Sequence, residues 1–285
     1  MDAILRSLID GLLLGFVYGI AAMGLTLIWG VMNVINLSHG SLISLGMFSL
    51  YFLFTGLGIH PYLAVVITAI LGLLLGIVIY AIAVHRIINA PHLSTLLATY
   101  SVNMIILGIG TAILSTSPYN VPFDLGSIKV ATSVVPTTRL IAAIVAMLVA
   151  GGLYLFLQYS RLGRYIRAVT DNREAAEIVG IPSAQILAFS FGLGTMLAAI
   201  SGGLIATFFP FTILAGGAYE LKSFVIGVLG GLGNPVGSLF GGLILGAIEG
   251  LVPLAMPTTW TPVLEFVLFV LILLVRPTGL FGGSE

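Results

Sequence analysis

The chain is divided into apolar runs long enough to cross a membrane, and this feature limits its fold more than any other. Residues 62–84 contain no charge and a single threonine, and residues 140–157 contain no charge, serine, threonine or amide. A helix that spans the hydrocarbon core of a bilayer needs about 20 apolar residues. Further runs of this kind lie at residues 10–30, 38–57, 92–115, 185–209, 236–254 and 260–275. The sequence therefore predicts an all-α polytopic membrane protein with about eight or nine spans.

The composition excludes several classes of protein. Of the 285 residues, 59% are hydrophobic and only 7% are charged, so the chain lacks the polar surface of a water-soluble domain. Ten basic and ten acidic residues leave no excess of positive charge for nucleic acid. The absence of cysteine excludes disulfides and thiol-ligated metals. The apolar run 11–30 is too long for a signal-peptide core, and we interpret it as an uncleaved first span.

One apolar segment, residues 219–233, is short and rich in glycine. It is compatible with a short crossing or with one arm of a re-entrant hairpin, and the sequence leaves both open. We expect residues 1–285 to form a single transmembrane domain.

A charged segment indicates how this domain is oriented. Residues 159–182 hold seven of the twenty charged residues, four of them arginines. Short loops rich in Lys and Arg stay in the cytoplasm. We therefore expect a cytoplasmic loop at 160–184, and His85, Arg86 and Arg276 place two more loop ends on that side. Alternation then predicts an external loop at 115–138, a cytoplasmic carboxy terminus and an external amino terminus, which Arg6 opposes.

Glycines recur at intervals of four in three of the predicted spans. The series are Gly11, Gly15 and Gly19; Gly72 and Gly76; and Gly242, Gly246 and Gly250. Small residues at this spacing let helix backbones approach closely in a membrane. The three series predict tight helix packing, although glycine is also common in transmembrane helices generally.

Two polar interruptions fall within the apolar sequence, one in each half of the chain. The first contains Asn33, Asn36, Ser38 and His39; the second spans residues 216–223 and is followed by the glycine-rich segment 230–237. Interrupted, short apolar segments in the two halves of a transporter point to discontinuous helices near its binding site. The first interruption therefore predicts a translocation path or gate, with an ordinary turn that caps the next helix as the alternative.

Two carboxylates, Glu249 and Glu265, lie inside predicted spans, where a lone charge is costly. They can line the path, pair with another helix, or be protonated and structural. The chain has no Walker-type GxxxxGK[ST], HExxH or GxSxG sequence, and no strand–helix alternation surrounds its glycines. We predict neither a catalytic site, a metal site nor a cofactor.

Residues of the charged segment resemble a known signature. Glu174-Ala-Ala-Glu-Ile-Val-Gly180 is similar to the EAA-x-x-x-G motif of permease subunits in bacterial ABC importers. Together with the segments 33–40, 163–169 and 229–237, it resembles the branched-chain amino acid (LIV-type) permeases. The alanines would let a short helix lie close in an ATPase groove, and Gly180 would close that helix with a left-handed cap.

The resemblance implies a fold, partners and coupling residues. It implies a type II ABC importer-like bundle in the bacterial inner membrane, a related second permease subunit, two ATPase subunits and an external solute-binding protein. The residues that it assigns to ATPase coupling are Arg164, Arg167, Arg173, Glu174, Ala175, Ala176, Gly180 and Ile181.

Three alternative functions remain. Urea or short-amide permeases are very similar to the LIV-type family. A proton-coupled carrier would use Glu249 or Glu265 as its proton site, and a stand-alone channel would need neither. The EAA-like helix distinguishes the classes, because a carrier or a channel has no need of it.

Overall fold

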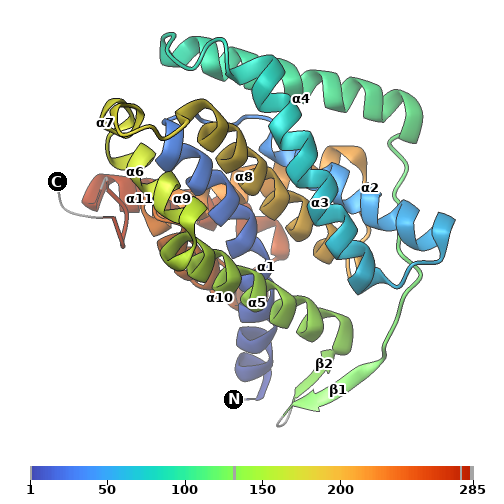
Figure 1. Ribbon diagram of the computed structural model, residues 1–285. Helices are drawn as coiled ribbons and strands as arrows, with labels where there is room; N and C mark the ends of the chain where they lie inside the picture. The colour runs from blue at the N-terminus through green and yellow to red at the C-terminus, as the bar shows by residue number, and fades with distance from the viewer. Residues whose placement is uncertain (1, 131–132, 277, 283–285) are drawn as a thin grey trace.

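The chain forms a bundle of helices with one small β-hairpin (Figure 1). The computed structural model describes residues 2–130, 133–276 and 278–282. The elements are α1 (Asp2–Met32), α2 (His39–Leu57), α3 (Pro61–Ile79), α4 (His92–Leu114), β1 (Ser127–Val130), β2 (Ser133–Pro136), α5 (Thr137–Tyr159), α6 (Arg161–Asp171), α7 (Arg173–Ile178), α8 (Ser183–Ala206), α9 (Gly216–Gly230), α10 (Pro235–Ala255) and α11 (Thr261–Val275), with a π-helical turn η1 (Tyr80–Val84) after α3 and short 3₁₀ turns η2 (Ile213–Ala215) and η3 (Thr258–Trp260) before α9 and α11.

Nine helical segments within the described residues are long and apolar enough to cross a membrane. This number agrees with the predicted eight or nine, and every predicted run corresponds to one of them. The ambiguous glycine-rich segment joins η2 to form a single helical stretch, Ile213–Gly230, of 18 residues. The segment is therefore helical throughout in the structure.

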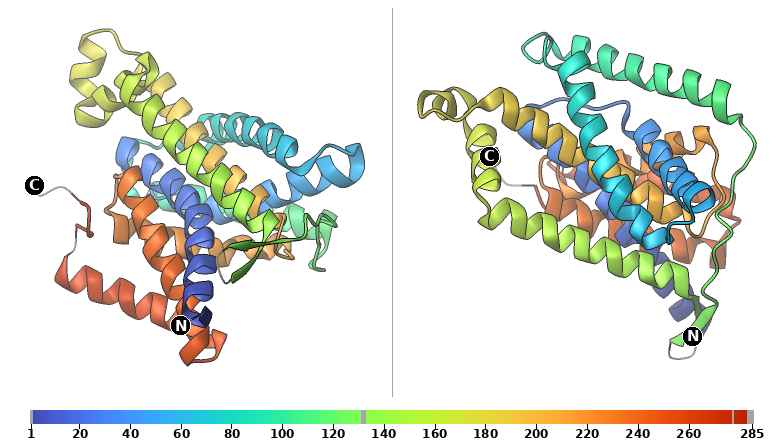
Figure 2. Two further views of the ribbon diagram at one scale, coloured as in Figure 1. Left: turned by 90° about the horizontal axis from the view of Figure 1, so that it is seen from below. Right: turned by 45° about the vertical axis from the view of Figure 1, so that its right-hand side comes forward.

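Helix α1 lies at the centre of the bundle (Figures 1 and 2). It packs against α10 and α8 along much of its length, and also contacts α5 and α9. Helix α8 is similarly enclosed, between α1, α2 and α3. Helices α4 and α11 lie at the rim, where most of their side chains are exposed.

The glycine series explain why α1 and α10 approach so closely. A Cβ atom at Gly11 would meet the backbone of Gly246 and Gly250, and one at Gly15 would meet the backbone of Gly242. The predicted series of α1 and α10 are therefore two sides of one interface. In the same way, the series of α3 faces α8, where a Cβ at Gly72 would meet Ala199. Tight packing through small residues is confirmed.

One end of the bundle, which we call the hairpin end, carries β1 and β2. The two strands pair antiparallel, and Tyr119 forms an isolated bridge with Phe211, which joins the connection before α5 to the one after α8. The sequence predicted only an external loop, residues 115–138, at this place. The structure adds a hairpin and begins α5 at Thr137, while residues 131–132 of that loop lie outside the described residues.

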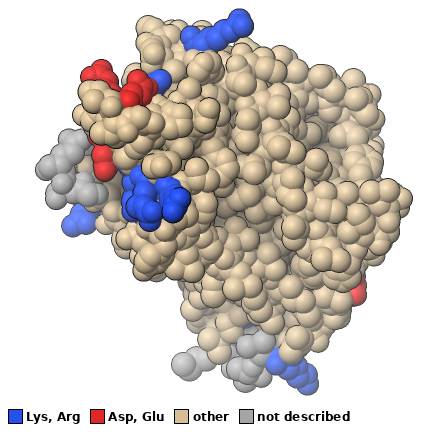
Figure 3. Space-filling view, in the orientation of Figure 1, with Lys and Arg blue, Asp and Glu red and all other residues tan. Residues whose placement is uncertain are grey.

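The opposite end carries α6, α7 and the connection 85–91, and we call it the α7 end. Charged side chains gather over α6 and α7, beside a broad face of uncharged residues (Figure 3). Such a face is what a membrane-embedded bundle presents to lipid.

Candidate functional site

The chain between α1 and α2 turns back into the bundle. Nε2 of His39, the first residue of α2, lies 2.9 Å from the carbonyl oxygen of Ala21. Ala21 precedes the end of α1 at Met32 by eleven residues, or roughly 16 Å along the helix axis. Residues 33–38 therefore return through membrane depth as non-helical backbone, which starts at Asn33 with a positive φ of 53°. The predicted interruption is thus a true helix break.

Unpaired backbone is costly at this depth, and side chains of the bundle satisfy it. The hydroxyl of Thr99, on α4, donates a 3.1 Å hydrogen bond to the carbonyl oxygen of Ile35. The same hydroxyl accepts a 3.2 Å hydrogen bond from the N–H of Leu37. Within the break, Oδ1 of Asn36 accepts hydrogen bonds from the backbone and the hydroxyl of Ser38. The break is therefore an ordered structure with defined partners.

The second polar interruption meets the first one in space. The backbone N–H of Gly216, at the start of α9, donates a 2.9 Å hydrogen bond to the hydroxyl of Ser44 on α2. A Cβ atom at Gly40 would collide with the carbonyl of Gly216 and with the side chain of Glu220. The first turns of α2 and α9 are thus in contact, and the Glu220 side chain lies against the first turn of α2. A helix amino terminus favours a carboxylate at such a position.

A cavity of about 360 Å³, which we call the central cavity, lies where the two interruptions meet. Its volume is within the range of small-ligand pockets, about 300–1,000 Å³. Asn36 and Glu220 supply its polar groups, while the rest of the lining is apolar or glycine. The lining residues are Leu25, Ile35, Asn36, Leu37, Leu96, Gly217, Glu220, Leu221 and Phe224.

The predicted gate residues of the break differ in what they do. Asn36 lines the cavity, and its Nδ2 has no hydrogen-bond partner among the described residues. Ser38 and His39 are fully buried and line no part of it; they hold the break together and fix α2 to α1. Asn33 is exposed near the α7 end, beside Val169 and Arg173 in a smaller cavity. Of the four, the structure brings only Asn36 to the central cavity.

Glu249 and Glu265 are paired with a lysine on a third helix. Nζ of Lys222, on α9, lies 2.5 Å from Oε2 of Glu249 on α10 and 3.3 Å from Oε1 of Glu265 on α11. The same ammonium lies 4.9 Å from the ring centroid of Tyr18 on α1. We call Lys222, Glu249 and Glu265 the charged triad; it joins three helices. Both carboxylates therefore pair with another helix, which is one of the three roles left open for them.

The triad borders a second cavity of about 410 Å³. Lys222 and Glu249 line it together with Asp10 and Arg139, which form a 3.4 Å ion pair of their own. Glu265 does not line this cavity and is only 5% exposed. The sequence analysis missed Lys222, yet an intramembrane lysine in a chain with two intramembrane glutamates was a signal for this pairing.

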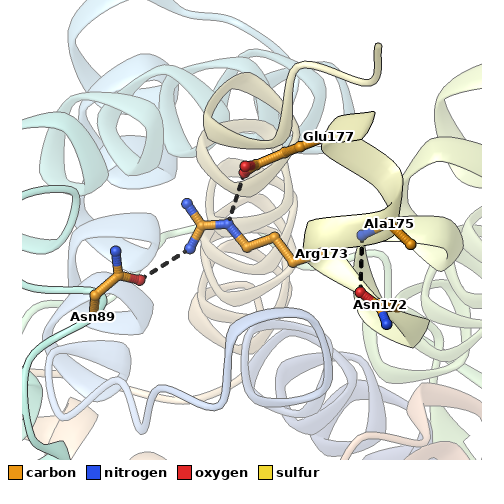
Figure 4. A network of polar contacts seen from close by, with 5 residues as sticks. All are labelled: Asn89, Asn172, Arg173, Ala175 and Glu177. Carbon is orange, nitrogen blue, oxygen red and sulfur yellow. Dashed lines mark hydrogen bonds and ion pairs between the residues drawn. The ribbon is translucent and has the colours of Figure 1, made fainter. Parts of the chain in front are cut away.

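At the α7 end, two short helices form the charged segment, each with its own amino-terminal cap. The hydroxyl of Ser160 accepts from the N–H of Gly163, and Oδ1 of Asn172 accepts from the N–H of Ala175 (Figure 4). Helix α7 ends at Ile178, and Gly180 follows in a left-handed conformation with a φ of 86°. The next residue, Ile181, donates its N–H to the carbonyl of Ala176, as in a Schellman cap. The predicted left-handed cap is confirmed.

The predicted coupling arginines bind within the chain. Arg167 donates to the carbonyl of Leu157 and to the side chain of Gln158, and Arg164 donates to the carbonyl of Tyr159 over 3.1 Å. Both arginines therefore hold the carboxy-terminal turn of α5, where cations are favoured.

Arg173 connects the charged segment to the rest of the α7 end. It pairs with Glu177 over 3.2 Å and donates to Asn89 on the connection before α4 over 3.2 Å (Figure 4). Glu174 is exposed in the first turn of α7, where its charge matches the helix dipole.

The two alanines of the signature face opposite ways. Ala176 is 4% exposed and packs into the chain, so it lies away from any docking face, whereas Ala175 is exposed. Of the two alanines, only Ala175 is open to contact with a partner. The sequence analysis missed Ile178 and Val179, which are 86% and 75% exposed. The apolar pair that follows Glu177 in this charged segment was the signal that could have found them.

Comparison with known proteins identifies similar chains. A family model described as "Branched-chain amino acid transport system / permease component" matches residues 7–273. The high-affinity branched-chain amino acid transport system permease protein LivH of Salmonella typhimurium is 29% identical over 99% of this chain and 96% of its own. The corresponding permease BraD of Pseudomonas aeruginosa is 28% identical over the same shares.

A transport protein with a different solute in its name is also similar. The ribose import permease protein RbsC of Escherichia coli is 30% identical over 91% of this chain and 82% of its own. No solved structure matches the chain.

Proposed function

Because the chain belongs to the branched-chain amino acid transport system permease component family, we propose that it carries branched-chain amino acids through the inner membrane and is driven through α7 by separate ATPase subunits. It is a multi-pass ABC permease without an ATPase site of its own. Solute reaches such permeases from a binding protein, and energy comes from ATPases. We further propose a related second permease subunit as its partner in the membrane.

The proposed coupling role rests on the exposure of Ile178 and Val179. Both stand out from a short, doubly capped helix in the region where the charged side chains gather. Exposed large apolar side chains in a charged, water-facing region favour a protein contact. Gly180 and Asn172 fix the shape of α7, so the contact surface is preorganised. With Ala175 on the same helix, these residues form a surface that fits an apolar groove.

The substrate assignment rests on the relatives and on orientation. Two full-length relatives are named for branched-chain amino acids. We place the α7 end in the cytoplasm, since four arginines lie there, and the hairpin end outside. This placement rests on the same arginines that led the sequence analysis to predict a cytoplasmic loop at 160–184 and an external one at 115–138.

The test uses the assembly that copurifies with this chain, reconstituted in proteoliposomes with its binding protein. Leucine, ribose and urea are offered separately, with and without ATP inside the vesicles. We expect ATP-dependent leucine uptake. Uptake of ribose or urea in place of leucine would overturn the substrate, and gradient-driven uptake without ATP would overturn the coupled mechanism.

A substitution tests α7 directly. Ile178→Asp should abolish copurification of the ATPase subunits, because a charge replaces the exposed apolar contact. Gln185→Asp places the same charge on a nearby exposed residue of α8 and should leave the assembly intact. Equal ATPase recovery from both variants would argue against docking through α7.

A further inference from the structure

We propose that the cavity between the two polar interruptions binds the transported amino acid, with the ammonium of the solute at Glu220, its carboxylate toward Asn36 and its aliphatic side chain against the leucines and Phe224. This inference rests on the proposed function and adds to it the residues that recognise the solute. The sequence analysis did not assign Glu220 a role.

Glu220 supplies the group that fits an ammonium. No lysine or arginine of the described residues lies within ion-pair distance of it, unlike the two carboxylates of the charged triad. Its neighbour is the backbone of Gly40, and it also lines the cavity. A carboxylate held at membrane depth without a protein cation is a site for a cationic group of a ligand.

Asn36 supplies a donor for the other end of the solute. Its Oδ1 is occupied by Ser38, which leaves Nδ2 as the free end of the amide. Asn36 is only 1% exposed and forms part of the cavity wall. A buried amide nitrogen without a hydrogen-bond partner costs free energy. A ligand carboxylate at this wall would recover that free energy.

The remaining walls fit a branched aliphatic side chain. Leu25, Leu96, Leu221 and Phe224 come from α1, α4 and α9 and surround the two polar groups with apolar surface. Apolar walls with a few convergent polar groups are typical of small-molecule sites. A sugar, with hydroxyls on every face, would leave most of its hydrogen bonds unpaired in this cavity.

A glycine of the lining allows the cavity to be filled without disturbing the fold. A Cβ atom at Gly217 would meet nothing within 4 Å. Gly217→Leu should therefore project a side chain into the site and reduce leucine uptake about tenfold or more, with a smaller loss for valine. Gly152→Leu is the matched control, since Gly152 is an equally open helical glycine on α5, away from the cavity.

A second variant tests the charge. Glu220→Gln retains an oxygen that can accept from the backbone of Gly40 but removes the negative charge. If Glu220 only caps α2, uptake by this variant should match that of the wild type. If Glu220 binds the ammonium of the solute, the kcat/KM for leucine should fall about tenfold or more, since the loss of a hydrogen bond to a charged group weakens binding by about that factor.

The experiment measures leucine and valine uptake by the copurified assembly in proteoliposomes, with the binding protein and the recovered ATPase subunits unchanged. A shift of the leucine-to-valine ratio in Gly217→Leu, absent in Gly152→Leu, together with the loss in Glu220→Gln, supports the site. An unchanged ratio with normal uptake in both cavity variants overturns it. Wild-type assembly that transports ribose or urea and no leucine overturns the proposed function instead, so the two failures are distinguishable.

Discussion

The backbone N–H of Gly216 donates a 2.9 Å hydrogen bond to the hydroxyl of Ser44 and so fixes the first turn of α9 to α2. These two residues belong to the two halves of the chain, and each lies in or just after a polar interruption of the apolar sequence. Their contact places both interruptions at one point inside the bundle, beside the central cavity.

The close approach at this point predicts opposite effects for two neighbouring glycines. Gly216→Ala would drive a methyl group into the backbone of Gly40 and should lower the thermal stability of the purified protein, by about 1–3 kcal/mol of unfolding free energy. Gly217→Ala meets open space and should be neutral or slightly stabilising. Equal melting temperatures for the two variants in detergent would contradict the contact.

The break between α1 and α2 should depend on one hydroxyl. Thr99→Val keeps the shape of the side chain but leaves the carbonyl of Ile35 and the N–H of Leu37 without this partner, at a cost of about 1–3 kcal/mol. Thr99→Ser restores the hydroxyl and should recover most of the stability. Thermal unfolding of the three proteins measures the difference, and a Thr99→Val protein as stable as Thr99→Ser would argue against the role.

The charged triad should be sensitive to the loss of its lysine. Lys222→Met leaves the buried Glu265 and the partly buried Glu249 without a cation, and breaking a buried ion pair costs about 3–5 kcal/mol. The triple variant with Met at 222 and Gln at 249 and 265 removes all three charges and should be much more stable than Lys222→Met. If the single variant is the more stable one, the ion pairs do not hold α9, α10 and α11 together.

The turn after α7 requires a left-handed residue at position 180. Gly180→Ala meets no steric obstacle, so its cost is backbone strain alone, roughly 1–2 kcal/mol. We expect weaker recovery of ATPase subunits with this variant. Gly180→Asn serves as the control, because asparagine adopts this conformation more readily, and it should restore part of the recovery.

The orientation in the membrane predicts which side reaches each loop. The chain has no cysteine, so single introduced cysteines report without interference. Asp171→Cys at the α7 end should react with an impermeant maleimide only in inside-out vesicles, and Asn120→Cys at the hairpin end only in right-side-out ones. Both positions are exposed. Reaction of the two from the same side would show that the assigned topology is wrong.

The sequence alone determined the class of fold, because the length of each apolar run is set by the thickness of the bilayer. It also located the charged segment, since charges do not stay in hydrocarbon, and the left-handed turn at Gly180, since few other residues adopt that backbone conformation. The glycine series were visible as well, although only the structure shows that the series of α1 faces that of α10.

Tertiary structure decided which polar groups meet. Nothing local to Lys222 says that Glu249 and Glu265 lie beside it, and nothing local to Asn36 places Glu220 in the same cavity, because helix packing brings together residues far apart in the chain. Packing also decided that Ala176 is buried while Ile178 and Val179 are exposed. An apolar pattern specifies that a helix is buried in lipid or protein, but the direction that each side chain faces follows from its neighbours in the assembled bundle.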